Sequence, residues 1–370
     1  MELSYPYFFV FGFLFIAGLF FSLPIFNYMD TKLPHTKNHN IPLESIRYFL
    51  ASFVFIAHSI GINDFILTGD FRGKYDQIDL LARSGVALFF AITGLLFWGK
   101  IKKGNTNWIS LYVNRFFRIV PLIWFNSALI CIIIIGLTKE APSIEIIKWF
   151  DFINNNRPDF TSMKGTWIFT AGVFWTLVFE WGFYFLLPAL SMFARRSFEL
   201  STLLAFILVY TGKIFFPQLQ LHYLMFFVIG MLASDISDRI NLKKHQLDII
   251  LSSSIALLLI FRPFPNDVSS FANVLYLTIM ICINKKADIF GLLKIKGFQR
   301  LGAASYSIYI MHAVVLYSLL EFAQKNDFLF GNEKIIYISG YFAVLLVSTF
   351  TYKFIEEKFM SIDRSFKTPK

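Results

Sequence analysis

The stretch from Tyr7 to Phe26 reads YFFVFGFLFIAGLFFSLPIF and contains no charged residue. It is long enough to cross a bilayer as one helix, which takes about 17–25 residues. It lacks the basic n-region and the small-residue cleavage site of a secretory signal, so we predict that it is retained as a transmembrane helix. Comparable apolar blocks recur along the rest of the chain.

The composition of the chain excludes an ordinary soluble domain. Hydrophobic residues make up 56% and charged residues 16% of the 370 positions, whereas a soluble domain carries about 25% charged residues. The net charge of +10 would suit nucleic acid, but Lys and Arg lie mainly in alternate short loops, as membrane topology requires. We therefore predict the lipid bilayer as a partner and no nucleic acid.

Apolar runs and polar breaks predict an all-α, polytopic transmembrane helix bundle of about eleven spans. The predicted spans are 6–26, 46–62, 81–98, 119–137, 167–193, 199–216, 220–234, 247–261, 271–284, 303–322 and 335–355. One set of loops carries roughly twice the Lys and Arg of the other, which places that set in the cytoplasm. The prediction is a multi-pass protein of the inner (cytoplasmic) membrane, with the N-terminus outside and the C-terminus inside.

Two ionisable residues lie on the second predicted helix. Arg47 and His58 are separated by about three full turns, so their side chains lie on one face, ~16 Å apart along the axis. A neutral imidazole can accept a proton from a hydroxyl near neutral pH, which makes His58 a candidate general base. The alternative is an arginine that only sets topology and a hydrogen-bonded core histidine.

A pair of arginines precedes the fourth predicted helix. Arg115 and Arg118 are spaced i,i+3 and are followed by Pro121, so both project from one side of a helix at the cytoplasmic interface. Guanidinium groups bind phosphate bidentately, so the pair is a candidate site for a nucleotide-type ligand. An anchor that contacts lipid headgroups is the alternative.

Two other apolar helices carry polar residues at spacings of about one turn. Glu180 and Tyr184 share a face of the segment 175–184, WTLVFEWGFY. A carboxylate buried in a membrane needs a partner or a proton, so Glu180 could orient a histidine or arginine, or bind an acceptor. Structural packing between helices is the alternative. The segment 305–312, SYSIYIMH, carries a similar set on one face, namely Ser305, Tyr309 and His312.

The cysteines and the loop histidines predict no metal site. Cys131 and Cys282 lie inside apolar blocks without CxxC spacing, so we expect buried thiols. His35 and His39 are spaced i,i+4, but Pro34 lies beside them and no acidic or third ligand is near in the sequence. A solvated loop is the favoured interpretation there.

Five segments together resemble the acyltransferase-3 family, multi-span enzymes that O-acylate carbohydrates. Arg47 and His58 match its pattern of arginine, ten residues, histidine. The segment 84–94, SGVALFFAITG, resembles its Gly-Val-x-x-Phe-Phe-x-Ile-Ser-Gly helix, with a threonine for the usual serine. The Arg-x-x-Arg pair with its proline and the segments 175–184 and 305–312 resemble three further motifs, in family order.

The resemblance covers roughly residues 42–355 and implies three regions. Residues 1–40 would form an additional N-terminal transmembrane helix and a cytoplasmic connection, 41–357 the ten-helix acyltransferase domain, and 358–370 a cytoplasmic tail. One departure concerns the acidic motif: Trp181 follows Glu180, where many members have a second acidic residue. Glu180 would then act alone.

The resemblance also implies a reaction. An acyl group, most commonly acetyl, would move from cytoplasmic acyl-CoA to a hydroxyl of a surface or lipid-linked carbohydrate, without a metal. Arg115 and Arg118, together with Arg47, would hold the CoA phosphates. His58 would be the general base, and Glu180 would hold its imidazole or position the acceptor. The supporting or substrate-binding residues would be Trp175, Tyr184, Ser305, Tyr309 and His312.

Two other functions use the same features. A transporter or flippase of a lipid-linked saccharide would employ intramembrane charges as a relay. A glycan polymerase would usually need a large extracellular loop, and the longest one predicted here, near residues 138–166, is modest.

Overall fold

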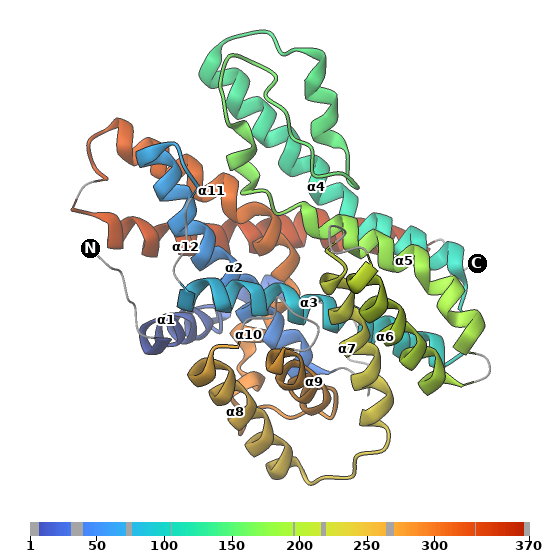
Figure 1. Ribbon diagram of the computed structural model, residues 1–370. Helices are drawn as coiled ribbons and strands as arrows, with labels where there is room; N and C mark the ends of the chain where they lie inside the picture. The colour runs from blue at the N-terminus through green and yellow to red at the C-terminus, as the bar shows by residue number, and fades with distance from the viewer. Residues whose placement is uncertain are drawn as a thin grey trace. The chain divides into compact units, whose positions relative to one another are not determined.

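The computed structural model describes residues 7–30, 40–71, 76–104, 106–194, 197–215, 220–263, 270–329 and 331–365. These residues form helices and loops and contain no strand, which confirms the all-α prediction. His35 and His39 lie outside the described residues. The helices, coloured along the chain in Figure 1, are α1 (Tyr7–Phe20), α2 (Ile41–Thr68), α3 (Asp76–Lys102), α4 (Trp108–Thr138), α5 (Trp175–Ala194), α6 (Phe198–Phe215), α7 (His222–Ser237), α8 (Lys244–Phe261), α9 (Phe271–Asn284), α10 (Lys296–Ala303), α11 (Ser305–Lys325), α12 (Glu333–Thr351) and α13 (Glu357–Ser365).

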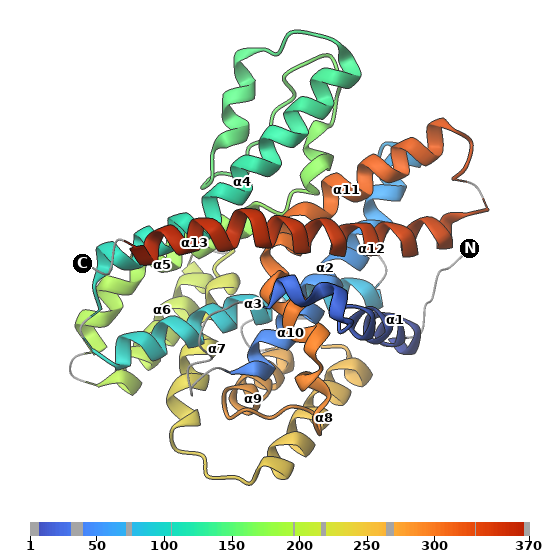
Figure 2. The same cartoon turned by 180° about the vertical axis from the view of Figure 1, so that it is seen from behind.

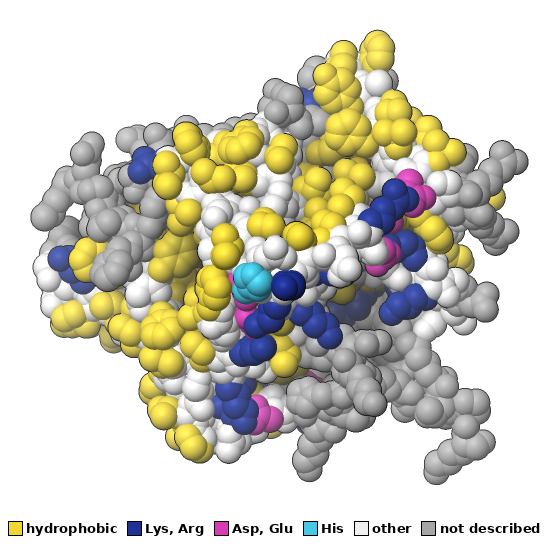
Figure 3. Space-filling view, turned by 90° about the horizontal axis from the view of Figure 1, so that it is seen from below, with side chains coloured by type: hydrophobic (Ala, Val, Ile, Leu, Met, Phe, Trp, Pro, Cys, Tyr) yellow, Lys and Arg dark blue, Asp and Glu magenta, His cyan; other side chains and the backbone are white. Residues whose placement is uncertain are grey.

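Seven described helical stretches are long and apolar enough to cross a membrane. They are Ile41–Thr68, Ile78–Lys102, Trp108–Thr138, Phe198–Phe215, Lys244–Phe261, Ser305–Lys325 and Lys334–Ser361. Shorter apolar helices cover Phe9–Phe20, His222–Ser237 and Phe271–Asn284. In the space-filling view of Figure 3, hydrophobic side chains cover much of the surface shown. The chain is therefore a multi-pass membrane protein, while the count of about eleven spans stays a prediction.

The fourth helix begins earlier than predicted. The predicted span starts at residue 119, but α4 begins at Trp108, where the side chain of Asn107 caps it by accepting a hydrogen bond from the Ser110 backbone N–H. Pro121 lies inside the helix. Arg115 and Arg118 are consequently interior residues of one long helix, because polar side chains end an apolar run without ending the helix.

The chain divides into two compact units. Unit 1 comprises Met1–Phe53, Leu80–Thr106 and Phe185–Ala303, and unit 2 comprises Val54–Asp79, Asn107–Tyr184 and Ala304–Lys370. Helices α2, α3 and α5 contribute residues to both units.

In unit 1, α3 and α7 pack with their backbones in direct contact. A Cβ atom added at Gly94 would lie 2.1 Å from the carbonyl oxygen of Phe227, and one added at Gly230 would lie 1.9 Å from that of Ala91. Only glycine permits such an approach at both positions, which is the usual way in which membrane helices gain packing contacts. Gly94, the last residue of the predicted SGVALFFAITG motif, therefore has a packing role.

A buried carboxylate links three helices of the same unit. Asp235 of α7 accepts hydrogen bonds from the Trp98 indole at 2.9 Å and from the Thr202 hydroxyl at 2.8 Å. The ammonium group of Lys102 lies 3.3 Å from this carboxylate. A buried charge is tolerated in a membrane protein when it is paired in this manner.

The N-terminal helix is an integral part of unit 1. The buried guanidinium of Arg300, on α10, donates to the carbonyl oxygens of Phe21 and Leu23, both at 2.9 Å, just after α1. It also pairs with the Asp30 carboxylate at 2.8 Å. The loop charges alone would assign Arg300 to membrane topology. In the structure it links the end of α1 to α10.

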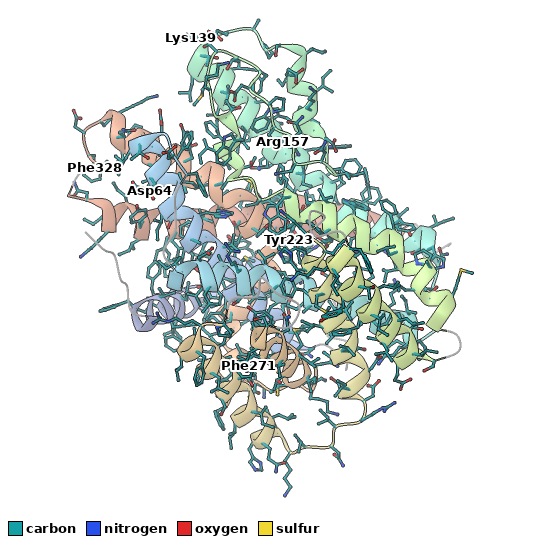
Figure 4. All side chains as sticks on the ribbon, in the orientation of Figure 1. Asp64, Lys139, Arg157, Tyr223, Phe271 and Phe328 are labelled. Carbon is teal, nitrogen blue, oxygen red and sulfur yellow. The ribbon has the colours of Figure 1, made fainter. Side chains whose placement is uncertain are left out.

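Unit 2 is built around α4, α11 and a long C-terminal helix. In Figure 2, α12 and α13 continue one another through a π-helical turn, Tyr352–Glu356, and α11 packs along α12. The segment that follows α4 folds back along it (Figure 1). Arg157, labelled in Figure 4, fixes this segment by donating to the carbonyl oxygens of Lys148 and Asn154 at 3.0 Å and of Asn156 at 2.9 Å.

Candidate active site

Two histidines from distant parts of the chain form a pair inside unit 2. The Nδ1 atom of His58, on α2, lies 2.9 Å from the Nε2 atom of His312, on α11. Their rings are stacked, with centroids 5.1 Å apart and planes at 28°. His312 is fully buried, whereas His58 is partly exposed. The sequence proposed both residues separately, and the structure brings them together.

Hydrogen-bond chemistry fixes which ring nitrogen of each neutral histidine carries the proton. The Nδ1 atom of His312 lies 2.8 Å from the carbonyl oxygen of Tyr309, which can only accept a hydrogen bond. His312 therefore carries its proton on Nδ1, and its Nε2 atom is an acceptor. His58 must then donate from Nδ1, which leaves the lone pair of its Nε2 atom available to bind a proton.

Tyr309 joins this pair to the start of α5. Its hydroxyl oxygen lies 3.2 Å from the hydroxyl of Thr176 and 3.2 Å from the carbonyl oxygen of Val173. The ring centroids of Tyr309 and His312 are 6.3 Å apart. Because the carbonyl group of Tyr309 holds His312, contacts that fix Tyr309 also fix the orientation of the histidine pair.

The acidic residue of α5 has its own partner. Tyr184 donates a hydrogen bond to Oε1 of Glu180 one turn earlier, and the guanidinium of Arg115 lies 6.0 Å from the centre of the Tyr184 ring. Among the described residues, neither histidine is hydrogen-bonded to Glu180. The group that holds the His58 imidazole here is His312, and Glu180 belongs to a second cluster with Tyr184 and Arg115.

Arg118, the other arginine of α4, is paired with the carboxylate of Glu356, to which the sequence patterns assign no role. Arg118 Nη1 lies 3.0 Å from Oε2 of Glu356, whose side chain is fully buried. Ser307 donates a hydrogen bond to the other oxygen of this carboxylate. Glu356 follows directly after the predicted span 335–355. The available sequence signal was an acidic residue directly after an apolar block, in a chain that also carries arginines at the membrane interface.

The remaining predicted residues are distributed as follows. Ser305 is buried at the start of α11, and its hydroxyl has no hydrogen-bond partner among the described residues. Trp175 packs edge-on against Phe179 at 5.8 Å between centroids. Arg47 lies on α2 but in unit 1, whereas every other predicted site residue belongs to unit 2.

No metal centre is visible in the described part of the chain, where no group of three or more potential ligands occurs. The two cysteines, Cys131 and Cys282, are buried and free, as the sequence predicted.

Comparison with known families identifies the family of this chain. The family model described as an acyltransferase domain, that of the acyltransferase-3 family, matches residues 40–353. Comparison with curated proteins and with solved structures gave no match. The match covers most of the chain and includes Arg47, His58, both arginines of α4, Glu180 and His312. The chain therefore belongs to the acyltransferase-3 family and is a membrane acyltransferase.

Proposed function

We propose that this protein is an O-acyltransferase of the inner membrane, which moves an acyl group from cytoplasmic acyl-CoA to a hydroxyl of a surface or lipid-linked carbohydrate. Acetyl is the simplest donor group. The observation that carries the proposal is the histidine pair, because it presents the Nε2 lone pair of His58 as a base within the unit that also contains the arginines of α4.

The proposed reaction is a direct transfer. The acceptor hydroxyl oxygen attacks the thioester carbonyl carbon while its proton moves to Nε2 of His58. The C–S bond breaks, CoA leaves as a thiolate, and the imidazolium returns the proton to that sulfur. A single general base contributes about 10²–10⁴-fold to the rate, and holding donor and acceptor together supplies much of the remainder.

His312 acts in this scheme as a positioning residue. Its Nε2 atom accepts the hydrogen bond from His58 Nδ1, which keeps the His58 ring in one tautomer and one orientation. The same bond strengthens when His58 becomes positively charged, because charge-assisted hydrogen bonds are stronger than neutral ones. His312 thereby favours proton uptake without contacting the substrate.

The two arginines of α4 receive different roles. Arg118 is committed to Glu356 at 3.0 Å, so part of its charge is already neutralised and its main task is to fix α4 against the C-terminal helix. We assign the phosphate contact of the CoA moiety to Arg115. A guanidinium group suits this task because it binds phosphate oxygens bidentately.

Glu180 is assigned to the acceptor. Its Oε1 atom accepts from Tyr184, and its Oε2 atom can accept a hydrogen bond from a second hydroxyl of the carbohydrate. Such a bond would favour acceptors that carry a second hydroxyl near the one that is acylated.

Reconstitution tests the assignment against the transporter alternative. The purified protein is placed in liposomes with acetyl-CoA labelled in its acetyl group and with a saccharide acceptor, either lipid-linked or a methyl glycoside. Free CoA and the labelled sugar ester are measured by mass spectrometry. We expect the unaltered protein to yield both products and the His58→Ala variant to yield neither, with equal expression. Full activity of His58→Ala, or saccharide movement without any consumption of acetyl-CoA, would overturn the proposal.

A further inference from the structure

A chain of aromatic rings leads from His58 to the surface of unit 2. The His58 ring centroid lies 5.9 Å from that of Phe71, Phe71 lies 5.7 Å from Trp167, and Trp167 lies 5.9 Å from Phe65. Each of these contacts is edge-to-face, with interplanar angles between 67° and 71°. Trp167 is 37% exposed, so these contacts connect the base to an accessible indole. We call Phe65, Phe71 and Trp167 the aromatic platform.

The platform extends along the face of α2 that carries the base. Phe65 follows His58 by seven residues, which is within about 20° of two full turns, so both side chains project from the same face about 10 Å apart along the axis. Asp64, labelled in Figure 4, marks this end of α2. A saccharide of one or two rings fits within that length, so the platform has the dimensions of a carbohydrate subsite next to the base.

Two glycines allow the platform rings to pack closely. A Cβ atom at Gly61 would lie 2.5 Å from the Phe71 ring, and one at Gly165 would lie 2.8 Å from the Phe65 ring. Gly165 also has a φ of 71°, a left-handed conformation that favours glycine. A side chain at either glycine would displace the ring that packs over it.

The segment that carries Trp167 is fixed independently. The Asp159 carboxylate accepts hydrogen bonds from the Thr166 backbone N–H at 2.9 Å, from the Thr166 hydroxyl at 2.7 Å and from the Gly165 N–H at 3.2 Å. These bonds fix the start of the short helix Thr166–Thr170, whose second residue is Trp167. A pre-organised aromatic side chain can bind a ligand without a large loss of conformational entropy.

We propose that the aromatic platform is the acceptor subsite, on which a pyranose ring stacks by its C–H face while one of its hydroxyls points at Nε2 of His58. This inference rests on the proposed function and deepens it by naming where the acceptor binds. A sugar ring has an apolar C–H face and a polar rim, and an exposed aromatic ring next to a polar base matches both. The platform lies beyond His58 on α2, towards the end of this helix at Thr68.

The test measures sugar binding apart from catalysis. The unaltered protein in nanodiscs, without acyl-CoA, is mixed with methyl β-D-glucopyranoside, methyl β-D-galactopyranoside or methyl N-acetyl-β-D-glucosaminide, and saturation-transfer NMR reports which sugar protons contact the protein. Glucitol, which has hydroxyls but no ring face, is the ligand control. We expect transfer to the ring C–H protons of at least one glycoside and none to glucitol.

Variants then locate the contact. Trp167→Ala should weaken glycoside binding about tenfold, the size expected for one aromatic contact, and Trp167→Phe should retain most of it. Trp124→Phe is the matched control, because Trp124 is also an exposed tryptophan of unit 2. It differs from Trp167 in donating its indole N–H to the Phe150 carbonyl oxygen. Equal binding by Trp167→Ala and the unaltered protein would refute the platform, as would the absence of binding by every glycoside.

Failure of this inference and failure of the proposed function remain distinguishable. Acetyl-CoA binding and transfer are measured on the same variants. If acetyl-CoA is consumed but Trp167→Ala leaves the KM for the glycoside unchanged, the platform is wrong and the transferase stands. If glycosides bind on Trp167 but no ester forms with any donor, the subsite stands and the proposed reaction is wrong.

Discussion

His58 and His312 are 254 positions apart in the chain, yet their Nδ1 and Nε2 atoms lie 2.9 Å from each other. The Tyr309 carbonyl oxygen, 2.8 Å from the Nδ1 atom of His312, sets the direction of that hydrogen bond. A helix-borne carbonyl therefore determines which nitrogen of His58 is free to take a proton.

The first prediction concerns the acceptor atom of His312. His312→Leu removes it and should lower kcat about 10²-fold while leaving the KM for acetyl-CoA unchanged, because the base loses its orientation and not its substrate. His312→Gln can still accept a hydrogen bond and should recover part of the rate. Steady-state kinetics and the pH dependence of kcat provide the measurement. Equal activity of the Leu and Gln variants would show that His312 only fills space.

The second prediction concerns recognition of the donor. Arg115→Ala should weaken CoA binding about tenfold or more, and Arg115→Lys should restore it only in part, because a lysine lacks the two-pronged geometry of a guanidinium. Isothermal titration with CoA and with 3′-dephospho-CoA measures the loss. An unchanged affinity for CoA in Arg115→Ala would remove the phosphate role.

The third prediction concerns the buried ion pair of Arg118 and Glu356, which are 3.0 Å apart. Glu356→Gln leaves a buried guanidinium without its counter-charge, and breaking such a pair costs about 3–5 kcal/mol. We expect a marked fall in Tm for Glu356→Gln and a smaller one for the double variant Arg118→Gln/Glu356→Gln. Arg118→Gln is measured as well: if the losses of the two single variants add up to the loss of the double variant, the pair is not coupled.

The fourth prediction concerns helix packing in unit 1. Gly94→Leu would force a side chain onto the Phe227 carbonyl oxygen, which lies only 2.1 Å from the position of a Cβ atom. The variant should therefore fail to accumulate as a folded, monodisperse protein. Gly136→Leu is the matched control, since a Cβ atom there would meet nothing within 4 Å. Size-exclusion chromatography in detergent compares them, and similar profiles would contradict the packing role.

The fifth prediction concerns pH. Hydrogen bonds from Arg300 lower the pKa of Asp30 from 3.8 to about 2, against the opposing effect of burial. A depressed carboxyl pKa stabilises the folded state above the unfolded value, and that stability is lost as pH falls from about 4 towards 2. The Tm of the unaltered protein should therefore fall more steeply over this range than that of Asp30→Asn, as followed by circular dichroism. Parallel curves would argue against the linkage.

Some sequence predictions needed no tertiary information. The apolar blocks predicted an all-α membrane protein because a segment in lipid must satisfy its backbone hydrogen bonds internally, and this property is local. Arg47 and His58 were placed correctly on one helix because the spacing of a regular helix is fixed. The helix limits were less accurate, as the early start of α4 at Trp108 illustrates.

The sequence did not predict the hydrogen-bond and ion-pair partners of these side chains. Periodicity places a residue on a face of its own helix but carries no information about which other helix packs there. The sequence therefore offered Glu180 as one holder of the His58 imidazole, whereas the hydrogen-bonded group is His312. Glu356 and Trp167 had no sequence signal of comparable strength, since each acquires its significance only from a neighbour distant along the chain.

The amino-acid sequence by itself determined that this chain forms helices in a membrane, to which family it belongs and which polar residues are exceptional there. Only the tertiary structure decided how those residues pair, that one histidine orients another and that an aromatic surface begins beside them. The physical reason is that hydropathy and helical spacing are properties of neighbouring residues, while a hydrogen bond between two helices depends on how they pack.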